Sequence, residues 1–504
     1  MTGASASGPA TAASDERGAP AGNLAIASIP LAVLFSFMAI GSVLPVLPLY
    51  VKGPVGAGDV AVGVVIGAFA ITAAIGRPLG GRLADATSRK RVLMIGLLAA
   101  SVGGSLLYLP LGVPGLVFAR LVLGFGDGWI FTAGVSWIVD LTPEERRGQV
   151  IGIFGISVWG GIALGSVIGQ ALYTAAGFDS VWAFATVAPL VGLLVSLRTP
   201  SPGHQPGSPS APEEVASAEM GAPLAPGDPA PAGGAGGAGA KRAWLPTSAL
   251  RPGFALLFAN IGFGTLAGFI VLLLDGEGIG HGAAAFTVFT ATVVFARLLL
   301  GWLPDRWGAR RSALAGGISQ AVGIATIGLA ASLPVVMAGA ILAGVGIALI
   351  FPSLALLVVN ATDPAARATA MGWFTSFFDI GVAVGAPFAG LVASTGGGEN
   401  YKAAFYAAAA VCLAGVGIAL IFPSLALLVV NATDPAARAT AMGWFTSFFD
   451  IGVAVGAPFA GLVASTGGGE NYKAAFYAAA AVCLAGALVG FAGTRNQPGS
   501  PAVA

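Results

Sequence analysis

Long apolar stretches, broken at intervals by glycine, proline or charged residues, follow one another along most of this chain. An apolar run of about 20 residues is long enough to cross the hydrocarbon core of a bilayer as an α-helix. The predicted spans lie at 24–50, 59–80, 91–110, 113–139, 148–173, 180–197, 251–274, 283–303, 312–332, 334–359, 367–394, 403–430, 438–465 and 474–493. The pattern therefore predicts an all-α polytopic membrane protein with about 14 spans.

Composition indicates the same class. Of the 504 residues, 56% are hydrophobic and 9% are charged, whereas soluble domains have about 25% charged residues. Such a chain must present apolar surface to a lipid bilayer, and its net charge of +1 gives no bulk attraction to nucleic acid. The two cysteines occupy copies of one position, so we expect no disulfide framework.

Segments without hydrophobic periodicity divide the chain. Residues 1–23 and 199–248 are rich in small residues and proline, so neither can bury a core. The expected organisation is a disordered cytosolic tail at 1–23, a six-helix bundle at 24–198, a flexible cytosolic linker at 199–248, a second bundle at 249–415, a duplicated segment with terminal helices at 416–495, and a tail at 496–504.

Basic residues are distributed unevenly between the predicted loops. With the N-terminus in the cytosol, the outer loops contain only Lys52, Lys402 and Lys473, and the other loop cations fall on the cytosolic side. Cytosolic loops of membrane proteins have an excess of Lys and Arg. We therefore expect both termini in the cytosol and a location in the plasma (inner) membrane.

Two internal repeats organise the helices. The diverged repeat relates the two bundles at an offset of 220; its pairs include Arg77 and Arg297, Gly81 and Gly301, Asp85 and Asp305, and Gly161 and Gly381. A constant offset indicates parallel repeats about an axis along the membrane normal, with a substrate site between them. The second repeat makes residues 342–415 identical to 413–486, a period of 71, through a tandem duplication or a sequence-assembly error. Without it the chain would have twelve helices and 433 residues (504 minus 71).

A loop signature occurs twice at the same offset. Its members are Gly81, Asp85, Arg89, Lys90 and Arg91 in the first copy and Gly301, Asp305, Arg310 and Arg311 in the second. The pattern resembles the signature G-x-L-x-D-x-x-G-x-[RK]-x-x-L of the major facilitator superfamily, and the first copy departs from it at Ser88. We expect these residues to latch one conformation at cytosolic helix ends. Cytosolic anchoring of basic loops is the alternative.

Charged residues inside the spans are the candidates for coupling, because a charge at the centre of a spanning helix costs about 2.5–3.5 kcal/mol or more. Arg120 and Asp127 are seven residues apart and share one helix face. The Arg120-x-x-x-Gly124 pattern resembles the helix-4 motif of proton-coupled family members, which implies a role in proton movement. Asp379 and its copy Asp450 could bind a proton or a cation. Structural contacts between helices are the alternative for all four charges.

A glycine ridge marks the fifth predicted helix, at Gly152, Gly161, Gly165 and Gly169. Glycines four residues apart allow tight helix packing across an interface. The spacing resembles the helix-5 signature of antiporters in the same family, although Ser166 replaces its proline. Generic packing of small residues is the alternative interpretation.

The sequence has no G-x4-G-K-[ST] phosphate loop, no zinc cluster and no nucleophile elbow. We therefore expect no catalytic residues, no metal, no cofactor and no enzyme activity; an intramembrane enzyme or a receptor is the rival from another class. The resemblance implies a secondary active transporter similar to proton-coupled drug or sugar efflux permeases. We expect export of a small molecule coupled to protons. Uptake by symport or uniport, and a carrier made non-functional by the duplication, are the alternatives; substrate and oligomeric state stay open.

Overall fold

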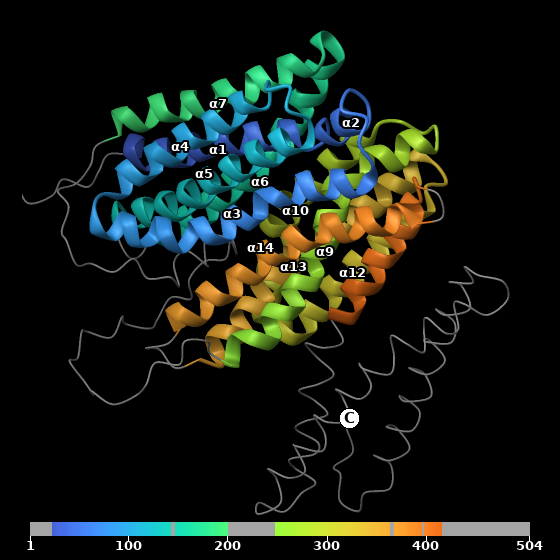
Figure 1. Ribbon diagram of the computed structural model, residues 1–504. Coiled ribbons are helices and arrows are strands. Elements are labelled where there is room, and N and C mark those ends of the chain that lie inside the picture. The colour runs from blue at the N-terminus through green and yellow to red at the C-terminus, as the bar shows by residue number, and fades with distance from the viewer. Residues whose placement is uncertain (1–22, 143–146, 200–246, 363–366, 396–397, 416–504) are drawn as a thin grey trace, which may run out of the picture. The chain divides into compact units, whose positions relative to one another are not determined.

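The computed structural model of the chain describes residues 23–142, 147–199, 247–362, 367–395 and 398–415 (Figure 1). These residues belong to one compact unit, Met1–Leu420. The other unit, Ile421–Ala504, lies outside the described residues. The predicted tails, most of the linker and nearly all of the second repeat copy, including Asp450, lie outside them as well.

The described residues are helical nearly throughout. The first bundle comprises α1 (Asn23–Val43), α2 (Leu47–Lys52), α3 (Asp59–Ala86), α4 (Arg89–Leu106), α5 (Gly112–Asp140), α6 (Arg147–Ala176) and α7 (Phe178–Arg198). The second comprises α9 (Thr247–Gly276), α10 (Gly282–Leu300), α11 (Leu303–Trp307), α12 (Ala309–Leu329), α13 (Leu333–Asn360), α14 (Arg367–Ala393) and the helical segment Tyr401–Gly415. Within the described chain, ten helices are long and apolar enough to cross a membrane. The all-α membrane prediction is confirmed there, and the count of fourteen spans stays a prediction.

Prolines mark two helix boundaries that hydropathy does not predict. The predicted span 24–50 is divided into α1 and α2, with Pro45 in the break and Pro48 in the first turn of α2. The predicted span 283–303 is divided as well: α10 ends at Leu300, and the short helix α11 follows with Pro304 in its first turn. A proline removes one backbone donor and fits the first turn of a new helix, where that donor is not needed.

The same helix pair packs closely in each bundle. Gly161, Gly165 and Gly169 of α6 lie so close to α1 that a Cβ atom on any of them would collide with it. Gly381 and Gly385 of α14 lie against α9 in the same way. The matched packing at an offset of 220 fits the parallel repeat. The neighbour that the glycine ridge contacts belongs to the same bundle, and the resemblance of the ridge to the antiporter signature stays a prediction.

The two bundles meet along α3 and α14 and along α6 and α10 (Figure 1). Gly63 and Gly67 of α3 lie against the backbone of α14, and the hydroxyls of Ser166 and Thr287 are 2.8 Å apart between α6 and α10. These contacts lie in the halves of the helices nearest Lys52, which we call the Lys52 end. In Figure 1 the ribbons of α3 and α14 separate toward the other end, which we call the Arg89 end.

Candidate functional site

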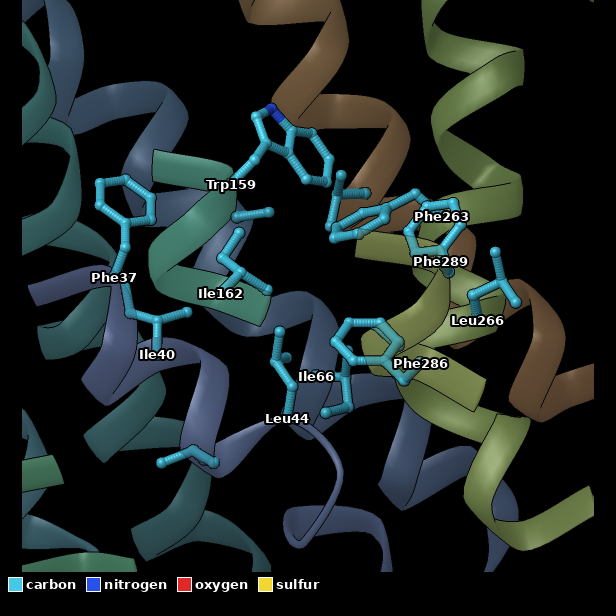
Figure 2. Close-up of a cluster of buried hydrophobic side chains, with 14 of the residues drawn as sticks. Phe37, Ile40, Leu44, Ile66, Trp159, Ile162, Phe263, Leu266, Phe286 and Phe289 are labelled. Carbon is cyan, nitrogen blue, oxygen red and sulfur yellow. The ribbon is translucent and has the colours of Figure 1, made fainter. Parts of the chain in front are cut away.

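A cavity lies between the bundles in the middle of the helices. The cavity has a volume of about 100 Å³ and is partly open. Its wall is mainly apolar: Figure 2 shows Phe37 and Ile40 of α1 and Ile162 of α6 on one side, and Phe263 of α9 on the other. An apolar wall with a few polar groups is typical of a small-molecule site.

Five charged side chains line this apolar cavity: Arg77, Arg120, Asp127, Arg297 and Asp379. Arg77 of α3 binds Asp379 of α14 through Nε, 3.0 Å from Oδ2, and through Nη2, 3.3 Å from Oδ1. The same Nη2 atom lies 3.9 Å from Oδ2 of Asp127 on α5. Both acids are 3% exposed, so their charges interact strongly with the arginine between them. One arginine therefore links an acid of the first bundle to an acid of the second.

Arg120 and Asp127 line the same cavity, but within the described chain they form no ion pair with each other. Arg120, which is 1% exposed, donates from Nε to the Val65 carbonyl and from Nη2 to the Ile66 carbonyl, both at 3.3 Å. Its Nη1 atom and Oδ1 of Asp127 have no hydrogen-bond partner among the described residues. Arg120 and Asp127 thus give the cavity a donor and an acceptor that have no partner among the described residues.

Each cavity arginine lies over an aromatic ring. The guanidinium carbon is 4.5 Å from the Phe131 ring centroid for Arg77, 4.7 Å from Phe69 for Arg120, and 5.5 Å from Trp159 for Arg297. The negative faces of aromatic rings attract cations, most strongly where water is excluded. The rings therefore help to retain three cations in an apolar wall. No cluster of side chains suited to holding a metal ion occurs in the part of the chain that the structure describes.

A second polar group joins the bundles at the Lys52 end, and we call it the Asp59 cluster: Lys52, Asp59, Glu399 and Tyr401. Oδ1 of Asp59 accepts from the Lys52 ammonium at 3.0 Å and from the Tyr401 hydroxyl at 3.1 Å. Its Oδ2 atom accepts from the Glu399 backbone N–H at 3.1 Å. The carboxylate is buried, so it closes this end of the interface with charge-assisted hydrogen bonds.

The residues of the loop signature lie at the Arg89 end. Arg89 donates to the Ser136 carbonyl at 2.6 Å, and Lys90 donates to the carbonyls of Leu197 and Thr199 at 3.0 and 2.6 Å. These bonds stay within the first bundle, and those of Lys90 satisfy carbonyls at the end of α7. Gly81 lies near Thr132, and Gly301 directly follows α10. Four charged members of the signature are exposed: Arg91, Asp305, Arg310 and Arg311. The side chain of Asp85 lies outside the described part of the chain. A latching role stays a prediction.

Sequence reasoning missed Arg77 and Arg297 as site residues. The signal was present, because both are charges within predicted spans and they match each other at the 220 offset. It also missed Asp59 and Tyr401, for which the sequence gives no comparable signal. Of the predicted residues, the structure brings Arg120, Asp127 and Asp379 into one cavity, and it places Gly152 at a smaller side cavity beside Arg297.

The chain matches the Major Facilitator Superfamily over residues 30–285, 253–416 and 408–503. It is 30% identical over 384 residues to the uncharacterized MFS-type transporter YhhS of Escherichia coli (strain K12), covering 74% of this chain and 87% of that protein. It is 28% identical over 400 residues to the uncharacterized MFS-type transporter STM4428 of Salmonella typhimurium (strain LT2), covering 77% and 94%.

Two solved structures share the fold. One is the human organic anion transporter MFSD10, with a TM-score of 0.57, 17% identity and coverage of 79% of this chain and 99% of that one. The other is the nucleoside transporter NupG, with a TM-score of 0.57, 15% identity and coverage of 78% and 98%. This chain belongs to the major facilitator superfamily, as its loop signature predicts, and is a multi-pass membrane transporter for small molecules.

Proposed function

We propose that this transporter exports a small amphipathic solute in exchange for protons, through alternating access to the cavity between the bundles. Asp127 and Asp379 are the proposed proton sites. Arg77 and Arg120 are the cations that respond when these acids gain or lose a proton.

The position of Arg77 between an acid of each bundle supports this proposal. While both acids are ionised, Arg77 links α3 and α5 to α14 across the bundle interface. A proton on Asp379 removes the charge that the guanidinium binds and weakens this link. Protonation thereby changes the relative stability of the state in which the bundles are joined here, and coupling requires such a difference between states.

We also propose that the Arg89 end faces the cytosol in the plasma membrane, with both termini on that side. The excess of Lys and Arg in the loops at this end supports the orientation. The loop-signature residues, including Asp305, then latch the state in which the Arg89 ends of the bundles approach each other. The exposure of Arg310 and Arg311 leaves these side chains available for such pairing.

Inside-out membrane vesicles with an acidic lumen and a pH-sensitive dye test the coupling. Lipophilic cations, organic anions, antibiotics and sugars are added singly to vesicles with the unaltered chain, Asp127→Asn or Asp179→Asn. Asp179 lies exposed at the start of α7 and provides the matched control. The solute of an antiporter alkalinises the lumen, and we expect this response in the control but not in Asp127→Asn. A response that survives in Asp127→Asn contradicts the proposal.

The charge of the cavity favours a second candidate, uptake of an anion together with a proton. Among the described residues, three arginines and two acids line the cavity, and an anion and a proton that bind together leave the net charge of the cavity unchanged. In the same vesicles, adding the solute of such a symporter acidifies the lumen further. The sign of the dye response therefore separates the two candidates.

A further inference from the structure

We infer that the transported solute passes between the central cavity and the lipid bilayer through an opening between α6 and α10. The solute is then a molecule that dissolves in the bilayer, with an aromatic or alkyl body and a small polar group. By central cavity we mean the one between the bundles that Arg77 and Asp127 line. The inference deepens the proposed function and rests on it only in taking the central cavity as the transport site.

A smaller side cavity, of about 50 Å³, lies beside the central cavity. It occupies the α6–α10 interface in the half of these helices nearest the Arg89 end. Gly155, Trp159 and Arg297 line both cavities. The two cavities are therefore adjacent, and Trp159 is the largest of the residues that they share.

The outer end of the side cavity opens at the surface of the helix bundle. Ile156 and Leu298 line the side cavity but not the central cavity, and they are 37% and 60% exposed. Both residues lie within apolar spans that are long enough to cross a membrane, Gly152–Ala176 and Gly282–Leu300. Exposed apolar side chains within such spans contact acyl chains. The side cavity therefore opens toward lipid and, in the proposed orientation, toward the cytosolic leaflet.

Trp159 separates the two cavities, and ring contacts hold it in place. Its ring centroid lies 5.5 Å from the guanidinium carbon of Arg297, and the ring packs edge to face with Phe263 at 5.7 Å (Figure 2 shows Trp159 and Phe263). Such contacts are individually weak, and an aromatic or alkyl solute replaces them with its own. The indole can therefore turn aside for a solute, while the Ser166 and Thr287 hydroxyls, 2.8 Å apart, join the helices nearer the Lys52 end.

The route determines the class of solute. A molecule on this route crosses the acyl-chain region before it reaches the central cavity. A sugar would lose its hydrogen bonds to water there without replacement, which is costly, whereas an aromatic or alkyl body gains from leaving water. The described wall of the side cavity is also mainly apolar. The opening therefore admits amphipathic molecules that partition into the bilayer and excludes strongly hydrated ones.

Tryptophans at the mouth of the side cavity test the inference. The mouth variant combines Ile156→Trp with Leu298→Trp, and the control combines Ile153→Trp with Leu299→Trp, two exposed neighbours that line neither cavity. Each chain is reconstituted in palmitoyl-oleoyl-phosphatidylcholine vesicles that contain a benzophenone with a dodecyl chain, and brief illumination couples this probe to nearby C–H bonds. Mass spectrometry then measures the labelling of the segment around Phe263, which lines the central cavity only.

We expect the dodecyl probe to label this segment in the unaltered chain and in the control. In the mouth variant the labelling falls by at least about tenfold, because two indole side chains fill so small an opening. A benzophenone with a hexaethylene glycol chain, which stays in water, labels the segment equally in both variants.

Equal labelling by the dodecyl probe in both variants overturns the inference, as do a parallel loss with both probes and an absence of dodecyl label around Phe263 in the unaltered chain. If the mouth variant melts at a lower temperature than the control, Ile156→Phe, which adds less volume, gives the deciding comparison. The vesicle assay of proton movement is scored independently. A bilayer route without proton movement contradicts the proposed coupling alone, whereas proton movement driven by a sugar contradicts the bilayer route and supports the coupling.

Discussion

The Asp59 cluster ties the bundles together at the Lys52 end, and removal of its central carboxylate loosens them there. Asp59 begins α3 and accepts hydrogen bonds from the Tyr401 hydroxyl and the Glu399 backbone N–H, both in the second bundle. Asp59→Ala removes both acceptors. We therefore expect a shift toward states in which the bundles are separated at the Lys52 end.

The magnitude follows from the bonds that cross the interface. A hydrogen bond to a charged group contributes about 1.5–3 kcal/mol net of the exchange with water, and we count the lower end, about 1.5 kcal/mol, for each of the two. The contact between Lys52 and Glu399 adds little, because Glu399 is 70% exposed. The Lys52–Asp59 pair lies within the first bundle and does not count. The loss of about 3 kcal/mol corresponds to a shift of roughly 150-fold in the equilibrium between states.

The distance between two spin labels measures this shift. Pro54→Cys in the first bundle and Ser394→Cys in the second are exposed positions at the Lys52 end, and replacement of Cys412 and Cys483 by Ala removes the native thiols. Pulsed electron paramagnetic resonance records the distance distribution of the purified chain. We expect Asp59→Ala to populate a longer distance than the otherwise identical labelled chain.

Glu277→Gln provides the matched control. It removes the ion pair of Glu277 with Lys402, 2.6 Å long and at the same end, but both residues belong to the second bundle. This variant leaves the distance distribution unchanged. If Asp59→Ala and Glu277→Gln give the same distribution as the parent, the Asp59 cluster does not hold the bundles together and the reasoning is refuted.

Three further predictions concern the interface and the duplicated segment. Gly63→Leu places a side chain where α3 and α14 are in backbone contact and lengthens the same label distance. Gly160→Leu does not, because an added Cβ atom there meets nothing within 4 Å. Asp379→Asn abolishes proton-coupled transport in the vesicle assay and Asp450→Asn retains it, because Asp379 binds the cavity residue Arg77. A variant lacking residues 416–486 retains transport in that assay, since the described residues that line the cavity and form the Asp59 cluster precede this segment. Loss of transport would show that the duplicated helices are needed.

Hydropathy predicts the helices well because the backbone of a membrane helix must satisfy its own hydrogen bonds, so length and apolar composition are sufficient signals. The predicted span 59–80 corresponds to α3, which continues to Ala86. A helix can extend into water where its side chains turn polar, and hydropathy does not register that extension. The breaks at Pro45 and before α11 depend on local hydrogen bonding, which hydropathy also ignores.

The site is predictable only in part, because helix spacing gives a shared face but not the neighbour that this face meets. Arg120 and Asp127 share a cavity, yet the partner of Asp127 is Arg77 on another helix. Arg77 and Asp379 are 302 positions apart, and no local pattern indicates such a contact. In the sequence, Asp59 is an acid in the first turn of a helix, which is a common position for an acid. Its contact with Glu399 of the second bundle is visible only in the folded chain.

The diverged repeat places residues at equivalent positions of the two bundle interfaces, and the partner of the arginine differs between them. Arg77 and Arg297 are 220 residues apart in α3 and α10, and Trp159 and Asp379 are likewise 220 apart in α6 and α14. At one interface the arginine binds a carboxylate at 3.0 Å, and at the other it lies 5.5 Å from the centre of an indole ring. A carboxylate can take up a proton and an indole ring does not. Through Asp379 the α3–α14 interface can therefore respond to protons, whereas Trp159, at the equivalent position of the α6–α10 interface, gives no such response.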